Sequence, residues 1–207
     1  MKITSIEQQK RDKHRFNFYV DGEYLFALYD DSILKYGLRK GDILTLEKIK
    51  EMKEYDEYNY GKKVAYNYLS YRQRSRKEIE RKMKTKKISP RVIDKVIKWL
   101  EELNYLNDEQ FAKQLIENKI ERRPIGRRML EQKLFQSGID RELRERSLTE
   151  NYSEEKELEK AEELLKKYIK KVKYKDEFDR RNKCFKYIVS RGFGYGIAEE
   201  VINKHLK

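Results

Sequence analysis

The residues best suited to chemistry in this chain are arginines and lysines that recur in three clusters. Arginine forks bind carboxylates and phosphates through paired hydrogen bonds, and a neighbouring tyrosine can stack or hydrogen-bond. The clusters contain Arg72, Arg74, Arg76 and Lys77; Arg122, Arg123, Arg127 and Arg128; and Lys170, Lys171, Lys173, Arg180 and Arg181. A solvated charge run would not need to recur at equivalent places. The recurrence therefore predicts that these residues bind an anionic partner.

The net charge of +13 is unevenly distributed along the 207 residues. Residues 1–60 carry 11 Lys and Arg against 12 Asp and Glu, whereas residues 61–108 carry 14 against 6. Residues 109–157 are balanced at 11 against 11, and residues 158–207 carry 14 against 8. This excess favours DNA, or a protein filament assembled on DNA, as the partner. A merely solvated basic surface is the alternative.

Residues that could support catalysis are sparse and scattered. His14 and His205 lie far apart in the sequence, and neither has neighbours at metal-ligand spacing. Cys184 is the single cysteine, which excludes an intrachain disulfide, and its position in a helical pattern predicts a small core residue. The glycine-rich segment 192–196 follows a predicted helix and lacks the Lys-Ser/Thr pair of a phosphate-binding loop. We therefore predict no enzyme activity, no metal and no cofactor.

The first 30 residues read as strands. Two runs rich in aromatic and branched residues, 15–20 and 24–28, are joined by Asp21-Gly22, which suits the positive φ angles of a tight hairpin turn. Residues 2–8 can add a third strand. The cross-strand pairs that a two-residue loop predicts are Phe18 with Leu25 and Tyr19 with Tyr24.

Two helices are expected to complete an N-terminal module. Asp30 and Asp31 are predicted to cap a short helix that ends at Gly37, and Thr45 to cap a longer helix running towards Tyr60. Residues 1–60 are therefore predicted to form a small α/β module that contains the hairpin.

From residue 61 onward the sequence pattern is helical and repeats. The apolar positions of one helix are Ile79, Met83 and Ile88, with counterparts at Leu130, Leu134 and Ile139 and again at Cys184, Ile188 and Phe193. The preceding helix of each unit aligns through Ala65, Ala112 and Ala161, and the following helix through Val96, Ser147 and Val201. This recurrence predicts three units of three helices, at residues 61–108, 109–157 and 158–207.

Capping signals agree with these units. Ser75 with Glu78 forms a capping box, Ser89-Pro90 supplies an N-cap and a first-turn proline, and Asn107 with Gln110 opens the next unit.

Charged residues make up 42% of the chain, and disorder is the competing interpretation of such polarity. The 16 Tyr and 8 Phe argue against disorder. We predict a mainly α fold of tandem three-helix repeats in an elongated curved array, preceded by the α/β module.

Several motifs resemble those of the RecX family of regulatory proteins. The segments that carry the resemblance are residues 69–75 with 78–79, residues 103–108 with 111–112, residues 124–126 and residues 134–139. Residues 20–23 and 36–41 are similar to the N-terminal extension of RecX proteins from Gram-positive bacteria. Asn104 stands where glycine is usual, and residues 149–152 end the second unit without the family's junction motif.

The resemblance implies a non-enzymatic regulator that binds the groove of the RecA–DNA filament. Such a protein inhibits the recombinase and ATPase activities of RecA and so modulates homologous recombination, DNA repair and the SOS response. The rival hypothesis is direct binding of single- or double-stranded DNA by a recognition helix, but the positive charge is spread over several units. We expect a cytoplasmic monomer without a membrane span, because no apolar run approaches 18 residues.

Overall fold

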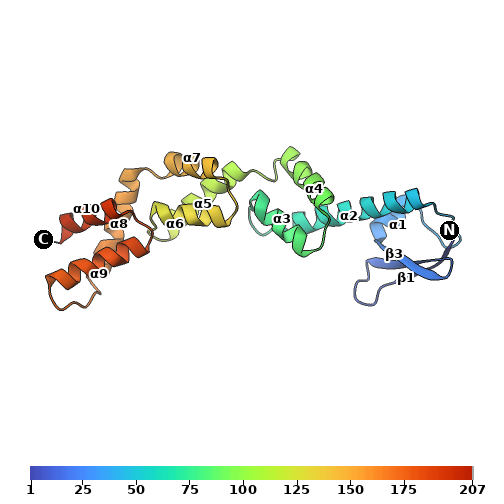
Figure 1. Ribbon diagram of the computed structural model, residues 1–207, viewed down its shortest axis with the longest axis horizontal. Coiled ribbons are helices and arrows are strands. Elements are labelled where there is room, and N and C mark those ends of the chain that lie inside the picture. The colour runs from blue at the N-terminus through green and yellow to red at the C-terminus, as the bar shows by residue number, and fades with distance from the viewer. Residues whose placement is uncertain (207) are drawn as a thin grey trace. The chain divides into compact units, whose positions relative to one another are not determined.

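The computed structural model describes residues 1–206, which form three strands and ten helices (Figure 1). The chain divides into two compact units. The first contains Met1–Arg72 and Ile79–Leu103, and the second contains Gln73–Glu78 and the chain from Asn104 onward. The expected fold class, mainly helical with a small N-terminal sheet, is confirmed. None of the helices in residues 1–206 is long and apolar enough to cross a membrane.

The N-terminal sheet has three antiparallel strands in the order β1 (Ile3–Gln8), β2 (Arg15–Val20) and β3 (Glu23–Tyr29). The predicted hairpin and third strand are therefore confirmed. Asp21 and Gly22 both adopt positive φ, at 52° and 93°, as the tight turn between β2 and β3 requires.

The predicted register of the hairpin is half right. Tyr19 pairs with Tyr24 as expected, but Phe18 pairs with Phe26 and not with Leu25, because a β-bulge shifts the register between Phe18 and Tyr19. The shift turns Leu25 towards solvent, where it is 45% exposed, and buries Phe26. The rings of Phe18 and Phe26 then stack with centroids 5.0 Å apart, so burial of a second phenylalanine favours the bulge.

Helix α1 (Asp30–Tyr36) ends at Gly37, which has φ 61° as predicted, but its N-terminus differs from the prediction. Neither Asp30 nor Asp31 is the N-cap; that position is Tyr29, which makes no side-chain cap. The amide of Tyr29 instead donates to Oδ1 of Asp56 at 2.8 Å. A carboxylate of another helix thus accepts the N-cap amide of α1.

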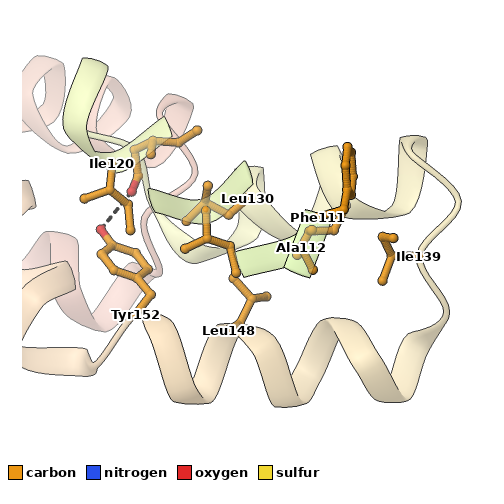
Figure 2. Close-up of a cluster of buried hydrophobic side chains, with 10 residues drawn as sticks. Phe111, Ala112, Ile120, Leu130, Ile139, Leu148 and Tyr152 are labelled. Carbon is orange, nitrogen blue, oxygen red and sulfur yellow. Dashed lines mark hydrogen bonds between the residues drawn. The ribbon is translucent and has the colours of Figure 1, made fainter. Parts of the chain in front are cut away.

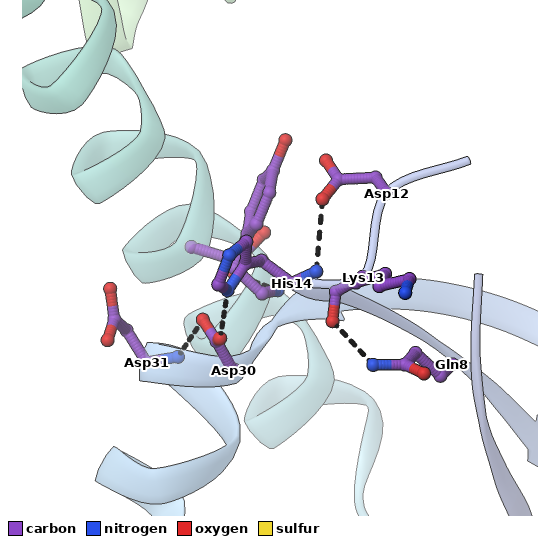
Figure 3. A network of polar contacts seen from close by, with 8 residues as sticks. Gln8, Asp12, Lys13, His14, Asp30 and Asp31 are labelled. Carbon is purple, nitrogen blue, oxygen red and sulfur yellow. Dashed lines mark hydrogen bonds and ion pairs between the residues drawn. The ribbon is translucent and has the colours of Figure 1, made fainter. Parts of the chain in front are cut away.

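Asp30 belongs to a polar network beside the sheet (Figure 3). Its Oδ2 lies 2.7 Å from Nδ1 of His14, and its Oδ1 accepts from the amide of Asp31 at 2.9 Å. The hydrogen bond from His14 lowers the pKa of Asp30 below its ordinary value. His14 therefore has a structural partner at the start of α1.

Helix α2 (Leu46–Leu69) is continuous, so the helix expected to run towards Tyr60 does not stop there. Thr45 caps it as predicted, accepting from the amide of Lys48. A Cβ on Gly61 would lie 3.1 Å from a methyl group of Val96, so glycine at this position lets α4 approach α2 closely. One helix thus serves both the N-terminal module and the first repeat, and the expected boundary at residue 60 falls inside it.

The remaining helices follow in threes. Their bounds are α3 (Arg76–Thr85), α4 (Pro90–Glu102), α5 (Asp108–Arg122), α6 (Arg127–Gln136), α7 (Arg141–Asn151), α8 (Glu154–Ile169), α9 (Glu177–Ser190) and α10 (Tyr195–His205). We call α3, α4 and the C-terminal half of α2 repeat 1, α5–α7 repeat 2, and α8–α10 repeat 3.

Equivalent positions of the repeats are buried alike, as their alignment predicts. The side chains of Ile79, Leu130 and Cys184 are fully buried, as are those of Met83, Leu134 and Ile188. Ala65, Ala112 and Ala161 in the first helices are also fully buried. Figure 2 shows the core of repeat 2, where the hydroxyl of Tyr152 donates to the carbonyl oxygen of Ile125 at 2.8 Å.

Most predicted caps are present. Ser75 and Glu78 exchange the two hydrogen bonds of a capping box, and Asn107 accepts from the amide of Gln110. Ser89 occupies the N-cap of α4, but its side chain makes no cap hydrogen bond. Its amide and hydroxyl donate to the carboxylate of Glu57 at 2.6 and 2.9 Å, which ties α4 to α2.

Candidate partner-binding surface

The three predicted clusters lie at the same place in each repeat, between its first and second helices. The first spans the α2–α3 loop and the start of α3, and the second spans the α5–α6 loop and the start of α6. The third spans the α8–α9 loop and the first turn of α9. The structure thus keeps the clusters equivalent, as their spacing suggests.

The backbone of the first two clusters joins one repeat to the next. The amide of Arg76, the first residue of α3, donates to Oδ1 of Asp108 at 2.7 Å. The amide of Arg127, the first residue of α6, donates to Oε1 of Glu157 at 2.8 Å. In each case a carboxylate at the start of the following repeat satisfies a free amide at a helix N-terminus, where negative charge is favoured.

Glycines make room for the same contact between repeats. We call this contact the joint: the helix start at Arg76 or Arg127 with the carboxylate of Asp108 or Glu157. Gly138 and Gly192 occupy equivalent positions after the second helices of repeats 2 and 3, with φ of 81° and 89°. A Cβ on Gly138 would collide with the side chain of Lys77, and one on Gly192 would collide with Met129. The start of the second helix in each preceding repeat therefore lies directly on these glycines. The equivalent residue of repeat 1 is Lys87, also at positive φ (58°).

Two of the predicted site residues hold the fold together. Nη2 of Arg127 donates to the carbonyl oxygen of Tyr152 at 2.5 Å, and Nε lies 3.8 Å from Oε2 of the buried Glu157. Burial raises the pKa of Glu157 even though Arg127 opposes the rise. Arg181 donates to the carbonyl oxygen of Leu206 and, at 2.6 Å, to Oδ1 of Asn203.

The other members of the clusters are exposed, except Arg74 and Arg180, which are half-buried. Arg128 lies with its guanidinium 4.9 Å from the ring centre of Tyr195. Arg180 stacks on Tyr174 at 4.8 Å and is also paired with Glu177. The remaining exposed members are Arg72, Arg76, Lys77, Arg122, Arg123, Lys170, Lys171 and Lys173, while Arg74 is half-buried.

Repeat 3 departs from the other two at this site. Arg76, Arg127 and Arg181 are equivalent, but α9 begins at Glu177, four residues before Arg181. This extra turn covers the helix start that makes the joint in the earlier repeats. The third cluster therefore lies in a loop and the first turns of α9, without the helix-start contact of the earlier repeats.

His205 and Cys184, which we considered as possible catalytic residues, have contacts that are typical of structural residues. His205 lies 3.4 Å from Glu162, and Cys184 is fully buried in the core of repeat 3, where burial raises the pKa of its thiol. Among residues 1–206, no three His, Cys, Asp or Glu side chains are grouped so that they could hold a metal ion.

Comparison with known proteins now identifies the family. The regulatory protein RecX N-terminal domain matches residues 1–45, the first three-helix domain of RecX matches residues 62–100, and the second matches residues 107–148. The regulatory protein RecX of Listeria monocytogenes (strain EGD-e) is 33% identical over 96% of this chain and 74% of its own length. The chain belongs to the RecX family.

Three further proteins resemble this chain, and two of them match nearly its whole length. The regulatory protein RecX of Clostridioides difficile is 30% identical over 99% of this chain and 95% of its own length. A crystal structure of regulatory protein RecX superposes with a TM-score of 0.71 at 26% identity, covering 98% of each chain. RecX from Lactobacillus salivarius gives a TM-score of 0.67 at 28% identity, over 72% of this chain and 96% of its own. Repeat 3, beyond the matched RecX domains, is thus shared with full-length relatives.

A second basic surface of this RecX protein was missed by sequence reasoning. It lies in the N-terminal unit, where Arg15, Lys50, Lys53, Lys86 and Lys87 line one cleft. Residues 1–60 carry a net charge near zero, so counting charges along the sequence did not indicate a basic surface there. The signal that could have revealed it is the helical spacing of Lys50, Lys53 and Tyr60 along one expected helix.

Proposed function

We propose that this RecX protein binds the groove of the RecA–DNA filament and inhibits the recombinase and ATPase activities of RecA, without being an enzyme itself. Its relatives are named regulatory proteins, and RecA as the partner follows from the resemblance of its motifs. The proposed contacts are the exposed arginines and lysines of the three clusters.

The observation that carries the proposal is the repeated joint. Arg76 with Asp108 and Arg127 with Glu157 make the same contact at successive repeats. Exposed side chains of neighbouring clusters therefore recur with similar surroundings. A helical filament presents the same surface at each protomer, so such an array suits several equivalent contacts at once, and linked contacts bind more tightly than single ones.

Arg127 must be left out of any test, because its side chain stabilises the joint. The informative variant is Arg122→Glu, Arg123→Glu and Arg128→Glu together, with DNA-stimulated ATP hydrolysis by RecA as the readout. A matched control reverses three cations of repeat 2 that lie outside the loop, Lys113→Glu, Arg141→Glu and Arg146→Glu. We expect the loop variant to lose inhibition and the control to keep most of it. Equal inhibition by both would contradict the proposed surface.

Direct DNA binding by the three-helix repeats is the alternative function, supported by the net charge of +13. Pull-downs with RecA alone, DNA alone and the assembled RecA–DNA filament separate the two. Retention mainly by the filament supports the proposal. Equal retention by naked DNA and filament, both lost in the loop variant, supports the alternative.

A further inference from the structure

Two adjoining clefts run along the N-terminal unit. The first, of about 690 Å³, lies between β2, β3, the N-terminal half of α2 and the α3–α4 loop. The second, of about 320 Å³, lies between the C-terminal half of α2 and α3. Tyr60 and Lys86 line both, so the clefts are neighbours that share a wall. We call their cationic and aromatic lining the tyrosine–lysine cleft: Arg15, Tyr29, Lys50, Lys53, Tyr60, Lys63, Tyr68, Tyr71, Lys82, Lys86 and Lys87.

The lysines of this cleft lack acidic partners. Lys50, Lys53, Lys63, Lys86 and Lys87 form no salt bridge with any residue in the described part of the chain. Elsewhere in the protein, surface lysines commonly pair with carboxylates along their own helices, as Lys160 and Lys167 do with Glu163. The cleft therefore gathers five lysines that no salt bridge within the described residues neutralises.

The carboxylates in the wall of the cleft are already engaged. Glu54 pairs with Arg91 at 3.1 Å, and Glu57 accepts from Ser89. Asp56 is buried and accepts from the hydroxyl of Ser32 at 2.5 Å as well as from the amide of Tyr29. Burial raises the pKa of Asp56, although the hydrogen bonds from Ser32 and Tyr29 oppose the rise. The acids of the wall are therefore bonded to other residues, while its lysines have no salt-bridge partner.

Aromatic rings alternate with these cations. Tyr29 and Tyr60 stack with centroids 5.2 Å apart, and the ammonium of Lys82 lies 5.2 Å from the ring centre of Tyr68. Tyr71, at the far end, is 85% exposed. Tyr29, Tyr60 and Tyr68 are half-buried, so Tyr71 supplies the open ring of the cleft. An exposed ring beside lysines without salt bridges suits a ligand that has both phosphates and flat bases, because unpaired bases stack on aromatic side chains.

Lys87 shows why the cleft is open in this repeat. Its equivalents Gly138 and Gly192 are covered by the preceding repeat, which is why they lack a Cβ. Repeat 1 has no preceding repeat, and the same position carries a lysine that lines the cleft. The docking position used between repeats is thus replaced here by an exposed cation.

We propose that the tyrosine–lysine cleft binds single-stranded nucleic acid, with its lysines contacting phosphates and Tyr71 stacking on a base. This site shares no arginine or lysine with the three basic clusters and requires no RecA, so it goes beyond the proposed function. A duplex, whose bases are already stacked, fits the tyrosines poorly. An acidic peptide would satisfy the lysines but would leave the rings unused.

The test measures fluorescence anisotropy of a labelled 20-nucleotide oligothymidine with the full chain and no RecA. The cleft variant is Lys53→Gln, Lys86→Gln and Lys87→Gln; the control, with equal charge loss, is Lys10→Gln, Lys40→Gln and Lys95→Gln, all exposed and outside the cleft. We expect the cleft variant to bind at least about fivefold more weakly and to lower the salt slope by roughly 2, at about 0.7 per phosphate contact. Equal weakening in both variants would overturn the site.

A second pair of measurements separates bases from charge. Tyr71→Ala should weaken binding of oligothymidine about fivefold or more while leaving an abasic strand of equal length unaffected. If the variant binds both strands like the parent, or if poly-glutamate competes as well as the strand, the cleft takes a polyanion without stacking and the proposal fails. Trp99 fluorescence and circular dichroism confirm that each variant is folded. Because RecA is absent throughout, these outcomes are independent of filament inhibition.

Discussion

The backbone amide of Arg127 donates to Glu157, the residue that its own side chain also approaches, so one carboxylate both caps α6 and neutralises its first residue. The equivalent bond from Arg76 to Asp108 lies one repeat earlier. In repeats 1 and 2 the start of the second helix is therefore capped by a carboxylate from the repeat that follows in sequence, as in other repeat proteins whose units are stabilised by their neighbours.

The first prediction concerns stability after the carboxylate of Glu157 is removed by substitution. Glu157→Ala leaves the amide of Arg127 without its acceptor and removes the negative charge beside its guanidinium, so the free energy of unfolding should fall by about 1–3 kcal/mol. Urea unfolding followed by circular dichroism measures the change. Glu155→Ala, on the exposed side of the same helix turn, is the control and should change little. Similar losses in both variants would mean that the joint contributes nothing specific.

A large part of the fold was predictable because helix periodicity, caps and repeat spacing agree with one another. Ile79, Leu130 and Cys184 are equivalent in sequence and equally buried. The hairpin register failed at Leu25, since a bulge depends on which phenylalanine the core accepts and not on the turn alone. The continuity of α2 through Gly61 was also missed, because the close approach of α4 is a tertiary contact.

The candidate site was less predictable than the fold. The recurring clusters were found from their spacing, but sequence gives no means of separating Arg127, which braces the joint, from exposed Arg122 and Arg123. The tyrosine–lysine cleft could not be predicted from charge counts either. Glu54 and Glu57 offset its lysines in such a count, but in the structure they bind Arg91 and Ser89.

The second prediction concerns the cysteine. Cys184 is fully buried and its pKa is raised by burial, so the native thiol should react with a water-soluble disulfide reagent far more slowly than the unfolded thiol. Its reaction rate under native conditions then reports local opening of repeat 3. Stopped-flow absorbance with and without urea gives both rates. Rapid, complete reaction of the folded protein would show that the core of repeat 3 is loosely packed.

The third prediction is a dependence of stability on acid pH. Glu162 accepts from Lys204 at 2.5 Å and lies beside His205, and these contacts lower its pKa from 4.5 to about 2. A carboxylate with a lowered folded pKa stabilises the native state above its unfolded pKa, and this contribution is lost as the pH falls from 4.5 towards 2. Glu162→Gln should therefore flatten the decline in thermal midpoint across that window. An unchanged decline would assign it to other carboxylates.

The last prediction uses two glycines four residues apart in repeat 3. Gly192 has φ 89°, and a Cβ there would collide with Met129, whereas a Cβ on Gly196 meets nothing within 4 Å. Gly192→Ala should therefore lower the free energy of unfolding by about 2 kcal/mol or more, since it combines a left-handed backbone with a clash in the joint. Gly196→Ala, in the first turn of α10, should instead raise it by at most about 1 kcal/mol.

The two alanine variants have the same composition, so their difference isolates position. Urea unfolding of both, with the parent chain alongside, supplies the measurement. The joint also predicts that Gly192→Ala loosens the loop at Gly126, whose amide donates to the carbonyl oxygen of Arg191 at 3.0 Å. Hydrogen exchange at that amide should accelerate in Gly192→Ala and stay slow in Gly196→Ala. Slow exchange in both variants, with Gly192→Ala as stable as the parent, would mean that repeats 2 and 3 do not meet at this glycine.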